Sequence, residues 1–321
     1  MQNYLRIPFW GSVIVVGVLP VTILLPVSFY AAGVWSDLFT KGGIYFLPYL
    51  VILTVTLMYS TRYVSRRLES LAAYSATLTT EGKRPELGAM YGLKGLFVTY
   101  ALQFSVIQTL YTATNLLPFY NLSQSFILSV AFIYWNFIIG TFLWVFSFSM
   151  FKIRGIGKMD LNLKPFSEDR TLGLRPFGRT SLDLTGLYLL LISLILIPQT
   201  FLINVAGPVL VFGLCLLAMG VIVFFLPLMG LHRKLVEARR EALVWISPQY
   251  TKRLDKLRED GLTKADERVF LELAGIDKIQ RDIGQIHSWP LDVGIITRLA
   301  AIIFSVAAIL LANIIRGLLH I

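Results

Sequence analysis

Seven long apolar stretches constrain this chain more than any other feature of its sequence. They cover about residues 11–34, 44–63, 95–117, 125–151, 183–204, 208–231 and 292–315. Each is about long enough for a helix to cross a hydrocarbon core of about 30 Å. Hydrophobic residues make up 56% of the chain, charged residues make up 15%, and the mean hydropathy is +0.69, which excludes an ordinary soluble domain. The sequence therefore predicts an all-α polytopic membrane protein with about seven transmembrane helices and a small helical cytoplasmic subdomain.

The basic residues orient these helices. Nearly all of the 29 Lys and Arg residues lie on one side if the N-terminus is inside. The outward segments hold only Lys41 and Arg316, and Arg298 lies within the last stretch. Because positive charge stays on the cytoplasmic side during insertion, we expect a multi-pass protein of the cell membrane with a cytoplasmic N-terminus and an outward C-terminus.

The net charge of +10 follows from these basic flanks. They are expected to meet anionic headgroups on the inner side of the bilayer. No basic, aromatic-interleaved soluble module is present, so nucleic acid is not an expected partner.

The chain divides into three parts by hydropathy and charge. Residues 1–231 hold the first six helices and two basic cytoplasmic loops, 64–94 and 152–182. The first loop begins as an amphipathic continuation of the second helix, whereas the second is punctuated by Gly and Pro and is predicted to be an ordered loop. Residues 232–290 form a cytoplasmic helical segment, and residues 291–321 hold the last transmembrane helix with a short tail.

The cytoplasmic segment contains an amphipathic helix over 263–286. Ahead of it, the sixth helix should continue inward to Trp245 and end at Pro248. Apolar residues then recur at steps of three and four, as one stripe: Val269, Leu273, Ile276, Ile279, Ile283 and Ile286. Because the segment is nearly neutral, we expect the stripe to pack on protein, either in a homo-oligomer or on the inner faces of the other helices.

Two prolines interrupt the first stretch. Pro20 and Pro26 have no N–H, so they should bend the helix and free backbone carbonyls. Lipid cannot satisfy such groups, so each freed carbonyl needs a partner from elsewhere in the protein.

Charged side chains are absent from the central regions of the first six stretches, which argues against an ion-coupled transporter. The polar side chains there and in the last stretch are uncharged, among them Gln103, Gln108, Asn136 and Asn313. They predict either interhelical hydrogen bonds or a hydrated path. Both alternatives stay open at this stage.

Arg298 is the one charge inside a stretch, about two turns from its inner boundary. Its long side chain can reach back to the interface. Alternatively it faces a pore or pairs with Asp292, which suits the positive end of the last helix. In a symmetric oligomer, a ring of Arg298 side chains would favour anions and exclude cations.

A second group of candidates lies in the loop 152–182. Glu168, Asp169, Arg170 and Arg175 are concentrated between Gly and Pro residues. Such a loop can form a ligand or gating site. The sequence favours the alternative that it is a salt-bridged linker.

Recognisable enzyme chemistry is missing from the sequence. The three histidines, His232, His287 and His320, are isolated, and no metal spacing, phosphate loop or nucleophile elbow occurs. The single cysteine, Cys215, allows no intramolecular disulfide. We therefore expect no catalytic residue, no metal and no cofactor.

The leading hypothesis from the sequence is an oligomeric channel or channel-like pore that prefers anions and is gated from the cytoplasmic side. The uncharged helices, the small outward segments and the cytoplasmic association helix favour it. One alternative is a non-conducting membrane sensor or scaffold that recruits a cytoplasmic protein partner through the 263–286 helix. The other is a small-solute transporter without charged intramembrane coupling residues.

Overall fold

The computed structural model describes residues 8–36, 43–79, 87, 90, 92–114, 122–202, 206–260 and 267–319. Every element in these residues is helical apart from an isolated β-bridge between Thr79 and Leu161, so the prediction of an all-α chain is confirmed for them. The elements are α2 (Phe9–Ser12), the π-helical turn η1 (Val13–Val18), α3 (Leu19–Ala31), α5 (Gly43–Leu78), α6 (Leu93–Thr114), α7 (Leu122–Ile156), α8 (Arg175–Leu202), α9 (Ala206–Asp260), α10 (Glu267–Gly284) and α11 (Val293–Leu319).

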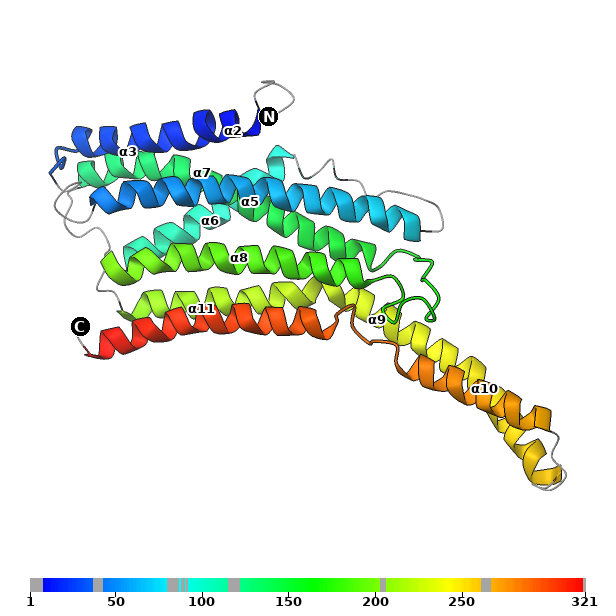
Figure 1. Cartoon of the computed structure of the whole chain (residues 1–321). Coiled ribbons are helices and arrows are strands. Elements are labelled where there is room, and N and C mark those ends of the chain that lie inside the picture. Colours follow the sequence, from blue (N-terminus) through cyan, green and yellow to red (C-terminus); the bar gives the residue numbers. More distant parts are fainter. Residues whose placement is uncertain are drawn as a thin grey trace.

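The helices form an elongated bundle from which one arm protrudes (Figure 1). α2, η1 and α3 join end to end into one rod, and α7 contacts α3, α5, α6 and α9. α8 and α11 complete the bundle, each packing on α9. The far half of α9 continues out of the bundle, and α10 folds back along it before the chain returns to α11 (Figure 1). The C-terminal end of α11 lies at the end of the bundle opposite the arm (Figure 1).

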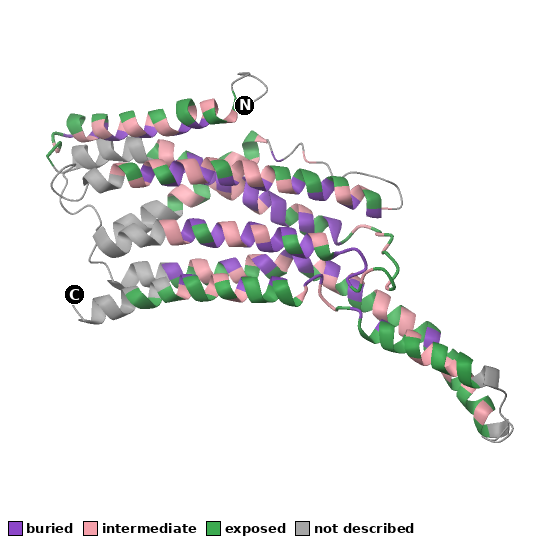
Figure 2. Ribbon diagram, in the orientation of Figure 1, coloured by how far each residue is buried: buried purple, intermediate pink, exposed green. Residues whose placement is uncertain are grey.

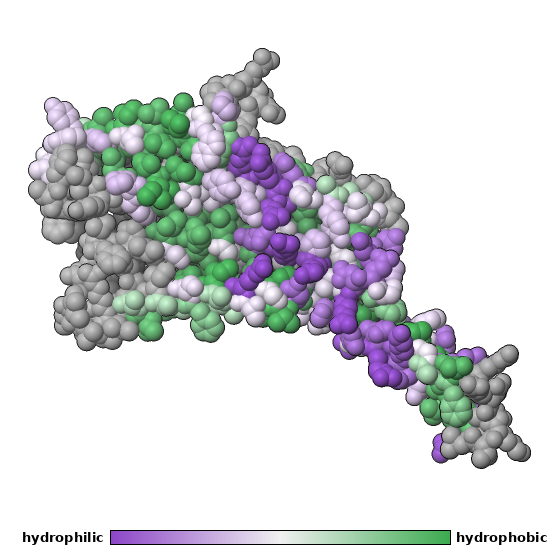
Figure 3. Space-filling model, in the orientation of Figure 1, coloured by the Kyte–Doolittle hydropathy of each residue, from purple (hydrophilic) through white to green (hydrophobic). Residues whose placement is uncertain are grey.

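Three of these helices are long and apolar enough to cross a membrane, judged by length and composition: Phe9–Ala31, Ile133–Ile156 and Gly213–Arg258. Val293–Ala308 is a shorter apolar helix of the same kind. The other apolar stretches of the sequence also fall on helices, namely α5, α6 and α8. On the face shown in Figure 3, apolar surface predominates among the coloured atoms of the bundle away from the arm, and hydrophilic surface gathers toward the arm end.

The buried core runs along the centre of the bundle and reaches its arm end (Figure 2). Its largest fully buried side chains include Leu53, Leu57, Phe142 and Phe224, which come from α5, α7 and α9. A smaller cluster of Val21, Leu25 and Leu50 joins the N-terminal rod to α5. Large apolar side chains therefore fill the interior of the described bundle.

Pro20 frees a carbonyl that a tyrosine hydroxyl then satisfies. Pro20 has no N–H to donate to the Val16 carbonyl four residues earlier, and the hydroxyl of Tyr134 on α7 donates to that carbonyl instead. The π-helical turn η1 lies immediately before this proline. The carbonyl freed by Pro20 thus finds its partner on a neighbouring helix, as the sequence required.

The same arrangement recurs between α5 and α8. Pro198 has no N–H for the carbonyl of Leu194, and the hydroxyl of Tyr49 donates to that carbonyl at 3.0 Å. Because Tyr49 is on α5, a proline in one helix becomes a specific link to another. Both links join segments more than a hundred residues apart in the sequence.

Two boundaries predicted from the sequence are wrong. Pro248 does not end the sixth helix, because α9 continues through it to Asp260. Pro248 and Val244, whose carbonyl it leaves unpaired, are exposed, so water can take the place of the missing N–H. The loop predicted over 152–182 is also shorter, since α7 extends to Ile156 and α8 begins at Arg175.

We expect Tyr134→Phe to lower the free energy of unfolding by about 0.5–2 kcal/mol, because the Val16 carbonyl then has no donor. In a Pro20→Ala background the same change should cost clearly less, because the new N–H can serve that carbonyl. The measurement is a double-mutant cycle of unfolding in detergent micelles, with Tyr59→Phe, whose side chain is 51% exposed, as the control. An equal cost in both backgrounds would show that Tyr134 does not act through the carbonyl freed by the proline.

Candidate functional site

The loop between α7 and α8 is organised around the carboxylate of Asp169. Its Oδ1 accepts hydrogen bonds from the backbone N–H of Thr171 at 2.9 Å and from the Thr171 hydroxyl at 2.8 Å, and its Oδ2 accepts from the N–H of Gly173 at 3.0 Å. This turn places Leu172 and Gly173 at positive φ, 52° and 85°. Burial opposes ionisation of Asp169, but these hydrogen bonds and the charge of Arg175 outweigh it and hold the pKa of Asp169 below its ordinary value.

The loop is also fastened to α5. The hydroxyl of Tyr74 donates to the Gly173 carbonyl at 2.8 Å, and the N–H of Asn162 donates to the Leu78 carbonyl at 2.6 Å. Burial, with the nearby charge of Asp169, raises the pKa of Tyr74, so its hydroxyl keeps the proton that it donates. With residues 171–174 buried, this part of the loop is an ordered structural element.

The connector 285–292 between α10 and α11 lies against this loop and against α8. The N–H of His287 donates to the Arg170 carbonyl at 3.0 Å. Asp292 pairs with Arg175 at 2.5 Å and accepts a hydrogen bond from the N–H of Ile295 at 2.8 Å, so it caps α11. Gly178 on α8 is buried against the connector, because an added Cβ there would overlap the Pro290 carbonyl oxygen.

His232 joins the connector to α9 at the point where the arm leaves the bundle. Its Nδ1 lies 2.6 Å from the Ser288 carbonyl oxygen, and its ring stacks on Trp289 with 4.2 Å between centroids and 18° between planes. Phe225 packs edge-on against the same indole at 5.5 Å. The base of the arm is therefore held by α9, the connector and the 157–174 loop together.

The arm consists of residues 233–260 of α9 and the whole of α10. α10 packs on α9, and Ile276, Ile279 and Ile283 of α10, with Ile286 of the connector, share one apolar cluster with the α9 residues Leu235, Ala238, Ala242, Leu243 and Ile246. Arg253 and Glu272 form an ion pair across the two helices at 3.1 Å. The predicted apolar stripe thus exists, but it packs on α9 of the same chain, and the side chain of Val269 lies outside the described residues.

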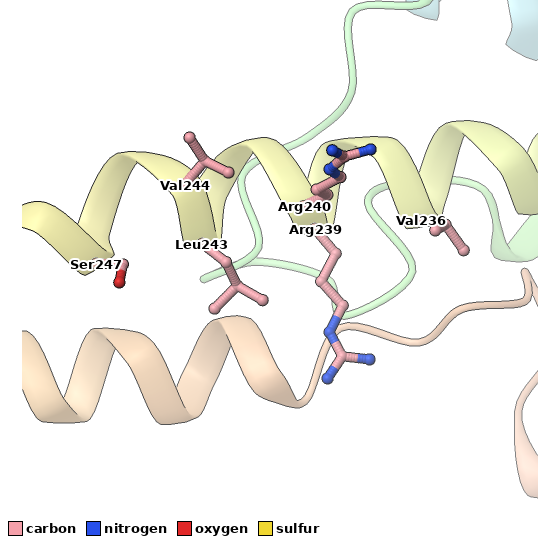
Figure 4. Close-up of a pocket in the computed structure, with 6 residues that line it drawn as sticks. All are labelled: Val236, Arg239, Arg240, Leu243, Val244 and Ser247. Carbon is pink, nitrogen blue, oxygen red and sulfur yellow. The ribbon is translucent and has the colours of Figure 1, made fainter.

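A groove of about 430 Å³ lies on the α9 side of the arm near its base (Figure 4). The residues that line this groove are Val236, Arg239, Arg240, Leu243, Val244 and Ser247. Within the described part of the chain, neither Arg239 nor Arg240 forms an ion pair. In Figure 4, Arg239 and Arg240 leave α9 in different directions.

Two of the uncharged polar candidates meet inside the bundle. The amide nitrogen of Gln103 on α6 donates to Asn136 Oδ1 on α7 at 3.2 Å. Gln103 Oε1 is buried without a hydrogen-bond partner. The pair forms an interhelical contact, whereas the side chains of Gln108 and Asn313 lie outside the described residues.

The charged candidates fall on surfaces or in structural contacts. Arg298 is exposed on α11, and Asp292 is paired with Arg175 rather than with Arg298. Glu168 and Arg170 are exposed in the loop, where Arg170 contributes its backbone carbonyl. Asp169 and Arg175 serve the fold in the ways described above, which agrees with the interpretation of this loop as a linker.

Three charged or polar residues near the arm end were not singled out from the sequence. Arg67 and Asp183 form an ion pair at 3.0 Å between α5 and α8, and the Tyr63 hydroxyl lies 3.4 Å from Asp183 and accepts from Arg67 at 3.0 Å. Tyr63 and Arg67 are one turn apart on α5, but Asp183 is far away in the sequence. No local pattern signals that contact.

The chain matches no protein-family model, and no curated protein or solved structure shows significant similarity to it.

We expect Asp169→Asn to lower the free energy of unfolding by about 1–3 kcal/mol near neutral pH, because it weakens hydrogen bonds to a charged acceptor. The folded-state pKa of Asp169 lies below its ordinary value of 3.8, so its stabilising contribution is present above that pH. As the pH falls through the folded-state pKa, that contribution is lost. The free energy of unfolding of the wild-type protein and of the variant should therefore be measured in micelles between pH 3 and 7, and the difference between the two should shrink toward pH 3. A difference that does not depend on pH would contradict the role of the charge.

Proposed function

We propose that this protein is a membrane-anchored docking protein whose apolar bundle holds the arm on the cytoplasmic side to bind a protein partner. The observation that supports this most strongly is the continuity of α9, a single helix from Ala206 to Asp260 that runs from the apolar bundle into the arm. The arm also exposes large apolar side chains, with Val244 65%, Trp245 61% and Leu271 67% exposed. Apolar surface on a protruding element is typical of a protein interaction site.

The proposed membrane topology has seven transmembrane helices, with the arm and the N-terminus in the cytoplasm and the C-terminus outside. Three helices meet the length and composition required of a span, and the other four apolar stretches coincide with further helices of the same bundle. The hydrophilic surface at the arm end agrees with the placing of the basic loops beside anionic headgroups (Figure 3).

The attachment of the arm suits docking better than free movement. α9 enters the arm without a break, and His232, Trp289 and the Arg175–Asp292 pair fix the returning connector to the bundle. A partner bound to the arm would therefore be held at a defined position relative to the membrane.

A second candidate function is an anion-preferring channel assembled from several copies. Exposure of Arg298 on the surface of α11 favours it, because only neighbouring copies could enclose that side chain in a pore. The interior of the described single bundle is filled by large apolar side chains such as Phe142 and Phe224, which argues against a path through one copy.

If the arm is a docking element, a photoreactive amino acid at Val244 or Leu271 should crosslink one and the same cytoplasmic protein in intact host cells. The lipid-facing control is Leu102, which is equally exposed on α6 and should give no such adduct. Replacing residues 236–283 by a short flexible linker should abolish co-purification of that identified partner while the protein still inserts. Co-purification that survives the replacement would remove the arm from the proposed function.

The channel candidate predicts discrete current steps in a planar bilayer under an asymmetric KCl gradient, reversing near the chloride potential. Arg298→Ala should move the reversal potential toward that of potassium, because it removes the positive ring, whereas Arg258→Ala near the tip of the arm should not. A silent bilayer containing folded, inserted protein, or an unchanged reversal potential, would count against this candidate.

A further inference from the structure

The groove begins at the edge of the contact between α9 and α10, where Leu243 faces α10, and extends onto a face of α9 that carries Arg240 and Val244 (Figure 4). The apolar cluster shared with α10 includes Leu235, Ala238, Ala242, Leu243 and Ile246 of α9, whereas Val236, Arg240, Val244 and Ser247 recur at steps of three and four on a neighbouring face. Leu254 falls on this second face about five helical turns after Val236, and it is exposed. The face therefore runs for about 27 Å along the arm.

The far end of this face is also apolar. The ion pair between Arg253 and Glu272 indicates that Leu254 and Leu271 lie at a similar level along the two helices, and both are exposed. Apolar contacts are thus available at the groove and again near the tip of the arm, which is the pattern that an amphipathic helix of about five turns would match.

The charge of α9 selects the kind of helix that fits. In the arm portion of α9, the acidic residues are Glu237, Glu241, Asp255, Glu259 and Asp260. The basic residues outnumber them: Arg233, Lys234, Arg239, Arg240, Lys252, Arg253, Lys256 and Arg258. Because Arg239 and Arg240 border the groove without an ion pair in the described chain, carboxylates are the complementary groups.

We propose that the groove binds an acidic amphipathic helix of a cytoplasmic partner, which lies along α9 as the third helix of the arm. Its apolar row would pack on Val236, Leu243 and Val244, and its flanking Glu or Asp side chains would pair with Arg239 and Arg240. This rests on the proposed docking function and names the chemistry of the partner.

A bilayer surface is a less suitable occupant for this face. Leu254 lies about 33 Å along α9 from His232, where the arm leaves the bundle. The arm points away from the bundle rather than back along its side (Figure 1). Headgroups at the base of the arm could reach Arg233 and Lys234, but they could not cover a face of that length.

The probe that tests the proposal is a fluorescent 18-residue helical peptide with Leu at every third or fourth position and Glu on both flanks. Its twin carries Lys in place of every Glu. Binding of each peptide is measured by fluorescence anisotropy to the full-length protein in zwitterionic nanodiscs. We expect the acidic peptide to bind at least tenfold more tightly than its twin, because only its flanks complement the arginines.

Variants then locate the binding. Arg239→Glu with Arg240→Glu should reverse the preference between the two peptides. Lys256→Glu with Lys278→Glu makes the same change of net charge on exposed residues outside the groove, and it should leave the preference in place. Equal binding of both peptides, no binding of either, or a preference that survives the groove reversal would overturn the proposal.

A labelling experiment distinguishes the membrane as the occupant. Ser247→Cys in a Cys215→Ser background places a thiol in the groove. If anionic nanodiscs without peptide protect this thiol from a water-soluble maleimide, the bilayer covers the groove and the proposal is wrong; ready labelling supports it. A peptide result that fails while Leu271 still crosslinks a partner would refute the acidic helix and leave the docking function standing, whereas loss of both would refute both.

Discussion

A backbone carbonyl inside an apolar bundle is stabilised by a donor from the protein itself, and this requirement accounts for two of the specific links between helices in this chain. Prolines in two helices remove donors at Val16 and Leu194, and Tyr134 and Tyr49 replace them from neighbouring helices. Each of these two hydrogen bonds fixes the position of one helix along the axis of its neighbour. A carbonyl that a proline leaves without its helical donor thus becomes the acceptor of a specific link between two helices.

At the arm end of the bundle, charged and hydrogen-bonded groups add to the apolar contacts of the core. Asp169 closes its turn through Thr171 and Gly173, and Arg175, at the start of α8, pairs with Asp292 at the start of α11. These contacts act together with the apolar core, which includes Leu172 and Leu174 of the loop and Leu291 of the connector. They place the connector, and through it the arm, in one defined position.

The sequence located the helices because apolar length is a property of a single segment. The sequence-based prediction that the helix ends at Pro248 was wrong because a missing N–H has different consequences in apolar and aqueous surroundings. Val244 is exposed, so water can donate to its carbonyl in place of the N–H that Pro248 lacks. The sequence could not foresee that Arg175 pairs with Asp292, or that His232 stacks on Trp289, since these partners meet only after the helices have packed. The periodicity of the apolar stripe was predicted correctly for α10. The pattern within one helix could not show that its packing partner would be α9 of the same chain.

The arm raises the question of why its apolar exposure is tolerated. Two packed helices share one line of contact, and the α9 side of the apolar cluster here includes Leu235, Ala238, Ala242, Leu243 and Ile246. Within the described residues, no further helix packs on the neighbouring face of α9 that carries Val236, Arg240 and Val244. In the proposed docking function, Arg239 and Arg240 would disfavour pairing of this face with a second copy of itself, because two copies would bring like charges together. The same charges attract an acidic surface. A two-helix arm with one apolar, basic face thus favours completion by a different, acidic helix over pairing with itself.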